Sequence, residues 1–196
     1  MEGDLEGDTV DRLGIPERST MADMGAPSRA LITESAAGLL RRLQERHGAL
    51  MFHQSGGCCD GSAPMCYPDG DFLVGDRDVL LAVLDVGTAE ARSKGAVGVP
   101  VWISGPQFEV WKHTQLVIDV VPGRGGGFSL EAPEGLRFLS RGRAFTDDEN
   151  TALAAVPVVT GVDYERGVRP SSLRTHIVAA TGPEIQASCP IPDTRP

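Results

Sequence analysis

Apolar residues recur at helical spacing in one segment of the chain, residues 34–47. One face of this segment carries four apolar residues: Ala36, Leu39, Leu40 and Leu43. Charged residues fill most of the other face, Thr33 stands at the N-cap position, and Gly48 stands at the C-terminal stop position. The pattern predicts an amphipathic helix that lies on an apolar surface.

Short apolar runs bounded by turn-forming residues follow this segment and indicate β-strands. We expect strands at residues 49–52, 72–74, 79–85, 99–103, 115–121, 128–131 and 136–139. The spacing from Ser104 to Gln107 is that of a capping box and predicts a short helix over residues 106–113. The expected fold is α+β, mainly antiparallel β with one N-terminal amphipathic helix and a short internal helix. Residues 28–145 are expected to form a single globular β-rich domain.

Apolar periodicity is absent at both ends of the chain. Residues 1–27 carry seven acidic and two basic residues and read as a disordered acidic arm. Residues 146–196 contain scattered Val and Ala with prolines, and we expect a loosely packed or disordered tail. An edge strand within residues 156–160 is the alternative.

The formal net charge is −9, and most of it lies in the two ends. The near-neutral middle has no basic stripe, and an acidic chain is repelled by phosphate backbones, so nucleic acid is excluded as a partner. The chain has no run of 18 or more apolar residues and no signal-peptide pattern at its start. We therefore expect a cytoplasmic protein that does not contact a membrane.

Three of the four cysteines lie within residues 53–66, a loop rich in glycine. Thiolate and imidazole are the ligands that zinc, iron and iron-sulfur clusters select, so Cys58, Cys59, Cys66 and His53 are the candidate metal ligands. Neighbouring residues of an extended chain point to opposite sides, so the pair at 58 and 59 reaches one ion only through an unusual turn. A redox or nucleophilic thiol, and inert packing of free thiols, remain open as alternatives.

Three further features favour structural roles. His113 is the last residue of the short predicted helix and has an apolar neighbourhood, where a histidine is more often a structural hydrogen-bonding group than a ligand. The glycine run 123–127 is followed by a strand-like segment rather than a helix, which predicts a hairpin turn and not a phosphate loop. The chain has no Gly-x-Ser-x-Gly motif, so hydrolase chemistry has no support.

Two strings resemble a bacterial family of unknown function, number 779 in the domain catalogue. They are MFHQSGGCCDGSAPMC (51–66) and WKHTQLVIDVVPGRGGGFSLE (111–131), and the resemblance covers about residues 30–145. Genes of that family often lie near aldehyde dehydrogenases. The resemblance therefore implies at most an accessory role, with an aldehyde dehydrogenase as the expected partner.

A second, remote resemblance is to A-type iron-sulfur carrier proteins of the HesB-like kind. It rests on the order Ile-Thr-x-x-Ala-Ala (32–37), Gly-Gly-Cys (56–58), Asp119 and Gly-Phe (127–128). The resemblance implies a small β-rich domain in which Cys58 binds iron or a cluster. The carriers' C-terminal Cys-x-Cys pair is missing here, and Cys59 and Cys66 are hypothesised to replace it.

The sequence thus favours an accessory metal-binding protein with iron, zinc or an iron-sulfur cluster. Because two or three ligands per chain leave a metal open to exchange or to completion by a second subunit, a homodimer is expected. One competing hypothesis is a thiol- or metal-dependent enzyme that acts on a small aldehyde or oxidant. The other is a metal-free module whose loop contacts a partner enzyme.

Overall fold

A computed structural model describes residues 26–56, 63–87, 98–124 and 127–169, together with the backbone of residues 174–175 and 177–178. The first half contains β1 (Ala30–Thr33), α1 (Glu34–His47), β2 (Leu50–Gln54), β3 (Met65–Pro68), β4 (Val79–Leu84) and β5 (Val99–Ile103). The second half contains α3 (Gly105–Trp111), β6 (Thr114–Pro122), the 3₁₀ turn η3 (Ala132–Glu134), β7 (Leu136–Ala144), α4 (Asp147–Ala154), β8 (Val159–Thr160), α5 (Gly161–Glu165), β9 (Arg174–Thr175) and β10 (Ile177–Val178). Within these ranges, no helix is both long and apolar enough to cross a membrane.

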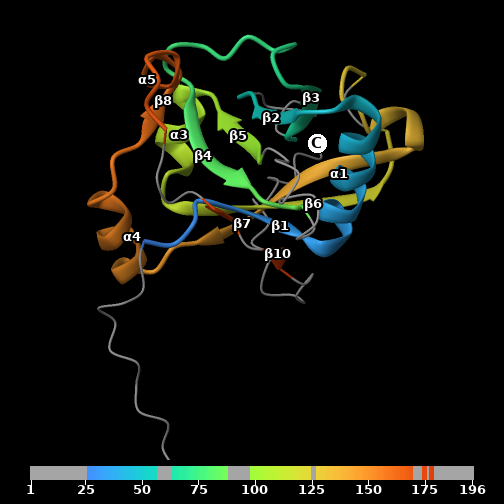
Figure 1. The fold of residues 1–196 in the computed structure, drawn as a ribbon. Coiled ribbons are helices and arrows are strands. Elements are labelled where there is room, and N and C mark those ends of the chain that lie inside the picture. The colour runs from blue at the N-terminus through green and yellow to red at the C-terminus, as the bar shows by residue number, and fades with distance from the viewer. Residues whose placement is uncertain are drawn as a thin grey trace, which may run out of the picture.

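The strands form two sheets. One has the order β10-β1-β6-β7, and the other has the order β3-β2-β5-β4-β8 with β9 also paired to β4. In Figure 1 the first sheet lies below the second, with α1 on the right and α4 and α5 on the left. The α+β class is confirmed, but the sheets are mixed, because β1 pairs with β6 and β2 pairs with β5 in parallel. Parallel pairing joins segments far apart in the chain, which local patterns do not reveal.

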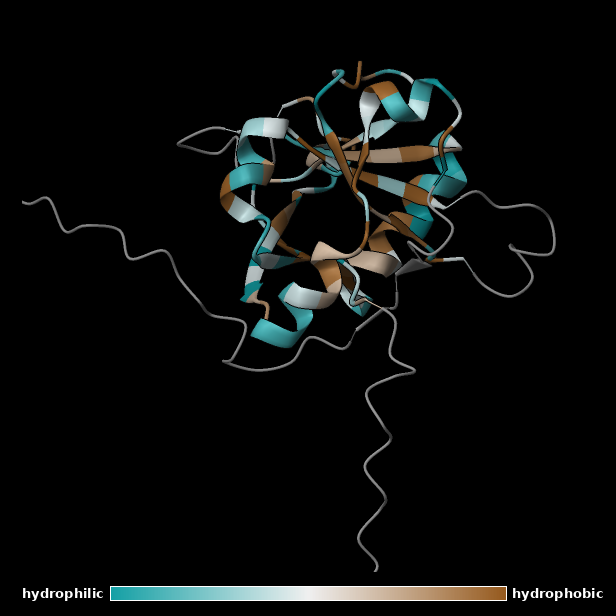
Figure 2. Cartoon of the chain, turned by 90° about the vertical axis from the view of Figure 1, so that its left-hand side faces the viewer, coloured by the Kyte–Doolittle hydropathy of each residue, from teal (hydrophilic) through white to brown (hydrophobic). Residues whose placement is uncertain are grey.

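The main core lies between the two sheets and is closed by α1. Its buried side chains come from α1 (Ala36, Ala37, Leu39, Leu40, Leu43) and from strands of both sheets, among them Ile32, Phe52, Val101, Ile118 and Phe138. Hydrophobic stretches accordingly concentrate on the central strands (Figure 2). Phe52 of β2 and Phe138 of β7 meet edge to face with ring centroids 4.9 Å apart, so one aromatic pair joins the two sheets.

The amphipathic helix begins and ends at the residues that the sequence predicts. The Thr33 hydroxyl accepts a hydrogen bond from the Ala36 amide, and Gly48 adopts a positive φ of 79°. Thr33 also donates to Asp119 on β6 at 2.8 Å, and the same carboxylate accepts from Arg141 on β7 at 2.8 Å. Burial raises the pKa of Asp119, but hydrogen bonds from Arg141, Thr33 and the Val120 amide outweigh it and hold the pKa below its usual value. The start of the helix is therefore bonded to β6, and through Asp119 it is linked to β7.

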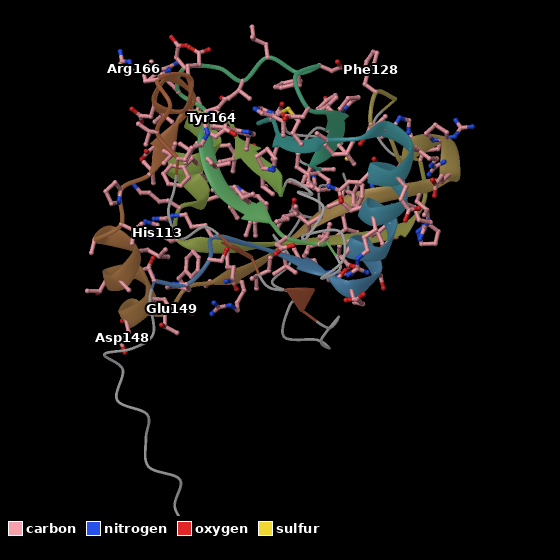
Figure 3. All side chains as sticks on the ribbon, in the orientation of Figure 1. His113, Phe128, Asp148, Glu149, Tyr164 and Arg166 are labelled. Atoms are coloured by element: carbon pink, nitrogen blue, oxygen red, sulfur yellow. The ribbon has the colours of Figure 1, made fainter. Side chains whose placement is uncertain are left out.

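Two predicted strands are absent from the described structure, and regular structure continues past the expected end of the domain. Residues 72–74 are irregular, and residues 128–131 form turns and a bend instead of a strand. Beyond residue 145, Thr146 and Thr160 each form a capping box that begins α4 and α5. The edge strand considered within 156–160 is present as β8. Tyr164 of α5, which is labelled in Figure 3, packs edge to face on Trp102. Residues 146–169 therefore contain regular structure where a loose tail was expected. These helices begin at capping boxes, which apolar periodicity does not reveal.

Gly161 at the start of α5 packs directly on the turn at Gly75. A Cβ atom at Gly161 would lie 2.2 Å from the Gly75 carbonyl oxygen, closer than any real contact. A Gly161→Ala variant is therefore expected to lose about 1–3 kcal/mol of unfolding free energy through overpacking, measured by urea denaturation. Gly127→Ala is the control, because a Cβ there would meet nothing within 4 Å. Equal stability of the two variants would contradict the predicted close contact.

Candidate functional site

The candidate site lies at the edge of the upper sheet where β2 and β5 end and β4 begins. Gln54 pairs with Ile103 at the ends of the parallel strands β2 and β5, and Ile103 pairs with Val79 at the start of β4. The loop between β2 and β3 leaves from this edge. Of that loop the structure describes residues up to Gly56 and again from Ala63, so Cys58 and Cys59 lie outside the described residues.

His53 is the predicted ligand that the structure places at this edge. Its side chain is only 4% exposed and stacks against Phe72 with ring centroids 4.3 Å apart. Nε2 lies 2.9 Å from Oδ2 of Asp78, and Nδ1 lies 3.0 Å from the Ser55 hydroxyl. Because a carboxylate only accepts hydrogen bonds, Nε2 is assigned as the donor to Asp78. In the neutral ring, Nδ1 then carries a lone pair and accepts from Ser55.

Asp78 is held in place by its own turn and by α5. Its Oδ2 accepts from the Gly75 amide at 2.8 Å, and its own amide donates to the Gly75 carbonyl at 2.9 Å. The Gly161 amide donates to the Asp78 carbonyl at 2.9 Å. The Gly75 amide therefore fixes the carboxylate that orients His53, and the turn and α5 fix the backbone of Asp78. Sequence reasoning missed Asp78, since 25 residues separate it from the histidine and only the pairing of β4 with β5 brings them together.

Cys66, another predicted ligand, faces the opposite side of the sheet. It pairs with Phe52 across the β2–β3 ladder, whereas His53 pairs with Met65. Side chains alternate between faces along a strand, so Cys66 points into the main core and His53 points to the outer face. Burial raises the pKa of the Cys66 thiol, and the nearby Glu131 raises it further, so the thiol is protonated at neutral pH. The structure does not bring His53 and Cys66 together.

Buried hydrogen bonds hold the backbone of Cys66 at the far end of the loop. The Cys66 amide donates to the Ser129 hydroxyl at 2.8 Å, and the Leu130 amide donates to the Cys66 carbonyl at 3.1 Å. The Ser129 hydroxyl in turn donates to Glu131, whose other oxygen accepts from the Phe138 amide at 3.2 Å. Residues 129–131, which were expected to form a strand, therefore fix the backbone at the C-terminal end of the loop between β2 and β3.

Glu131 makes this hydrogen-bond network sensitive to pH. The residue is 1% exposed, and burial raises its carboxyl pKa although hydrogen bonds from Ser129 and the Phe138 amide partly oppose the shift. A raised folded-state pKa gives stability that is complete below the ordinary pKa of glutamate and is lost as pH rises through the folded value. Each unit of pKa increase corresponds to about 1.4 kcal/mol.

The expected result follows from comparing the wild-type protein with Glu131→Gln between about pH 4 and pH 8. The wild-type unfolding free energy should fall relative to that of the variant as pH rises, because only the wild type must ionise a buried carboxyl group. Denaturant titrations at each pH measure the difference, and Glu45→Gln, at an exposed position, is the control. A difference that does not change with pH would contradict the raised pKa of this buried carboxyl group.

Two buried atoms of side-chain amides near the start of the loop have no hydrogen-bond partner among the described residues. They are Nε2 of Gln54, whose Oε1 accepts from Ser140, and Oε1 of Gln107. A Cβ atom at Gly56 would lie 3.6 Å from this Gln107 oxygen and 3.5 Å from the Ser104 hydroxyl oxygen. Unpaired buried polar atoms cost about 1–3 kcal/mol each.

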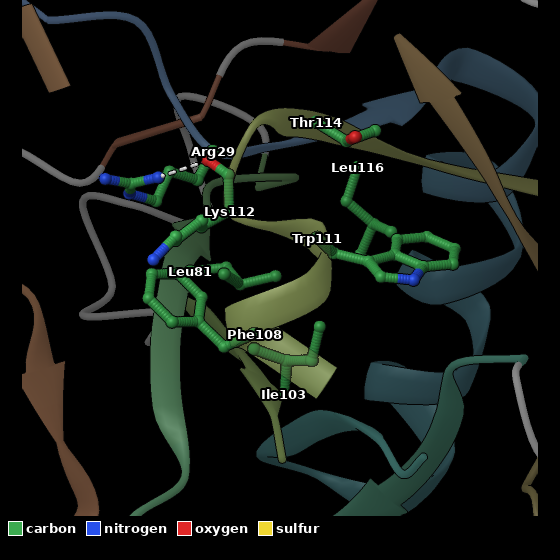
Figure 4. Close-up of a pocket in the computed structure, with 8 residues that line it drawn as sticks. All are labelled: Arg29, Leu81, Ile103, Phe108, Trp111, Lys112, Thr114 and Leu116. Atoms are coloured by element: carbon green, nitrogen blue, oxygen red, sulfur yellow. Dashed lines mark hydrogen bonds between the residues drawn. The ribbon is translucent and has the colours of Figure 1, made fainter. Parts of the chain in front are cut away.

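The other structural features give no second site among the described residues. His113 lies beside α4, where its Nδ1 is 3.2 Å from the Asn150 side-chain oxygen (Figure 3). A cavity of about 10 Å³ lies beside Trp111, next to the hydrogen bond from Arg29 to the Lys112 carbonyl (Figure 4). It holds about one water molecule and is too small for a substrate. No group of three or more His, Cys, Asp or Glu side chains suited to a metal occurs within the part of the chain that the structure describes.

Comparisons with known proteins agree with the first resemblance. A family model described as a domain of unknown function, DUF779, matches residues 39–144, more than half of the chain. No curated protein matches the chain. No solved structure matches it either, so the remote similarity to A-type iron-sulfur carriers stays a prediction.

Proposed function

Because the chain belongs to the DUF779 family, whose description names no activity, we propose a function from the chain's own residues: binding of a zinc or iron ion at the β2–β3 loop. The proposed ligands are the His53 imidazole and the thiolates of Cys58 and Cys59. The observation that carries the proposal is the His53–Asp78 pair, with 2.9 Å between Nε2 and the carboxylate.

A histidine that binds a metal commonly donates its other ring N–H to a carboxylate, which fixes the tautomer and orients the ring. His53 has this arrangement with Asp78, and its remaining nitrogen, Nδ1, faces Ser55 at the beginning of the thiol loop. Cys58 follows Ser55 by three residues, so covalent geometry keeps their Cα atoms within about 11 Å of each other. This reach supports His53 and the thiols as ligands of one ion.

Cys66 is left out of the proposed ligand set because its protonated thiol points into the core. The remaining set has at most three ligands per chain. Zinc prefers four ligands, so one position would remain for water, for exchange, or for a residue of a second subunit. Such an open site suits an accessory protein that transfers its metal. An aldehyde dehydrogenase as partner and a homodimer remain part of this proposal, as implied by the family resemblance and the incomplete ligand set.

A second candidate function uses the same histidine as a base. Catalytic cysteines are activated by a neighbouring imidazole that a third group orients, and Asp78 orients His53 in this way. In this alternative, Nδ1 of His53 takes the proton of Cys58 or Cys59, and the resulting thiolate attacks a small aldehyde or oxidant.

Analysis of the anaerobically purified full-length protein separates the two candidates. The proposal predicts about one zinc or iron per chain, lost in Cys58→Ser and His53→Ala but retained in Cys66→Ser and His113→Ala. Absence of metal after reconstitution with either ion would contradict it. If the metal-free protein instead contains one thiol that iodoacetamide alkylates much faster than free cysteine at neutral pH, the nucleophile alternative is supported.

A further inference from the structure

The lower sheet ends at β7, and the outer side of this strand is open. Among the described residues, β6 is the only strand that pairs with β7. The Phe145 amide donates to the His113 carbonyl, so Phe145 and every second residue before it direct their backbone groups toward β6. Ser140 and Gly142 lie between these residues and direct their N–H and C=O groups away from β6. Both residues are partly exposed, and these backbone groups have no partner within the part of the chain that the structure describes.

Arginine side chains line one face of the same edge. Phe138 points into the core, and side chains alternate along a strand, so Arg137, Arg141 and Arg143 project from the opposite, outer face of β7. Arg141 uses its Nε to bond Asp119, and its terminal nitrogens have no partner among the described residues. Arg137 makes no ion pair with any described residue. The edge therefore combines open backbone groups with positive charge.

A second copy of the chain does not fit this edge. Antiparallel pairing of β7 with the β7 of another copy would place arginines opposite arginines, and like charges that face each other destabilise a sheet. Charged side chains on an edge strand commonly prevent such self-pairing. The edge instead fits a strand that carries acidic side chains at every second position.

Residues 2–8 of this chain, the acidic segment, have that pattern. Acidic side chains stand at every second position of the segment: Glu2, Asp4, Glu6 and Asp8. The residues between them are small or apolar: Gly3, Leu5 and Gly7. In an extended strand the four acids share one face, and Leu5 lies on the other face. A strand that turns its acids toward the arginines therefore turns Leu5 toward the core side of the sheet.

We propose that the acidic segment pairs antiparallel with the open edge of β7 and extends the four-stranded lower sheet by one strand. Leu5 then lies opposite Ser140, so its N–H and C=O meet the open backbone groups of β7. Asp4 lies opposite Arg141 in the same register. This inference goes beyond the proposed function and does not depend on it, because the edge of β7 contains none of the proposed metal ligands.

The acidic segment can reach β7 within one chain. The Gln115 side chain of β6 donates to the Ser28 carbonyl, so Ser28 lies beside β1, two strands from β7. Two strand spacings amount to about 10 Å. Residues 9–27, the connecting segment, span up to about 60 Å when extended. Attachment to the same chain also raises the effective concentration of the acidic segment at the edge.

Hydrogen exchange at single amides of the full-length protein, followed by NMR, tests the pairing. The Ser140 and Gly142 amides are expected to be protected in the wild type and to exchange about tenfold faster in Leu5→Pro, which removes an N–H that the pairing uses. Ala22→Pro is the matched control, because residue 22 belongs to the connecting segment. The Arg141 amide faces β6, so its exchange should be the same in every variant and shows that the domain stays folded.

Two double variants test the contribution of charge. Asp4→Asn with Asp8→Asn removes two acids from the acidic segment, whereas Asp11→Asn with Asp23→Asn removes the same charge from the connecting segment. Only the first double variant is expected to speed exchange at the open edge of β7. Equal effects of the two would contradict the pairing of acids with arginines.

Fast exchange of the Ser140 and Gly142 amides in the wild type would overturn the proposal, and so would protection that survives Leu5→Pro. Protection that increases with protein concentration would also overturn it, because a second copy would then occupy the edge. Metal content is measured on the same samples and is expected to be unchanged by every variant, so failure of the pairing remains distinguishable from failure of the proposed function.

Discussion

An Asp78→Asn variant is expected to bind zinc or iron about 10- to 100-fold more weakly than the wild type, the effect usual for losing a carboxylate behind a histidine ligand. The asparagine oxygen still accepts from Nε2, so the ring keeps its place, but it lacks the negative charge that makes the imidazole a stronger ligand. Competition with a chelator measures the affinity. The fold should survive, since the bonds of the Asp78 backbone to Gly75 and Gly161 do not depend on the side chain.

Asp76→Asn is the matched control for this experiment. Asp76 lies in the same turn and is exposed, and its backbone carbonyl accepts from Val162. The control removes the same charge from the same turn, so it should leave the affinity close to that of the wild type. If both variants lost affinity equally, a general charge effect would explain the result, and the His53–Asp78 pair would have no special role.

A Phe138→Ala variant is expected to lose about 3–5 kcal/mol of unfolding free energy. The Phe138 ring is 1% exposed and meets Phe52 edge to face between the two sheets. Removing it leaves a cavity at the centre of the core and leaves the Phe52 ring without its aromatic partner. Guanidinium denaturation with an unchanged slope measures the loss.

Phe128→Ala is a control with the same chemical change at a different burial. Phe128 is 86% exposed, so its replacement should change the unfolding free energy by less than about 0.5 kcal/mol. Similar losses in the two variants would contradict the placement of Phe138 in the core that joins the sheets.

Local sequence signals predicted the parts of the fold that depend on neighbouring residues. The helix 34–47 with its caps and the strand 99–103 have the predicted bounds. Proline has no N–H to donate and is typical of an edge strand or a bulge, yet Pro100 lies in β5, which is an inner strand. The pairing resolves this, because β2 pairs with β5 only from Val101 onward, so Pro100 needs no N–H to bond to β2.

Features that depend on distant contacts could not be read from the sequence. β1 is four residues long and depends on parallel pairing with β6, which no local pattern announces. The helices beyond residue 145 carried a readable signal, since Thr146 with Glu149 and Thr160 with Asp163 have the capping-box spacing. Because the apolar faces of these two helices are weak, apolar periodicity did not predict them.

The candidate site shows the same division. His53 was found because it stands beside clustered thiols, but Asp78 became visible only when β4 and β5 paired. Cys66 was grouped with the other cysteines by closeness in sequence. Its pairing with Phe52 then turned it to the core face, because one residue along a strand reverses the direction of a side chain. Closeness in sequence therefore grouped side chains that the fold places on opposite faces of a sheet.

X-ray absorption spectroscopy of the zinc-loaded full-length protein tests the central claim most directly, because it counts the atoms bound to the metal. The account predicts one imidazole nitrogen at about 2.0 Å and two sulfurs at about 2.3 Å from zinc, with the imidazole signal lost in His53→Ala. A shell of three sulfurs that loses one in Cys66→Ser, or a shell without imidazole in the wild type, would contradict it.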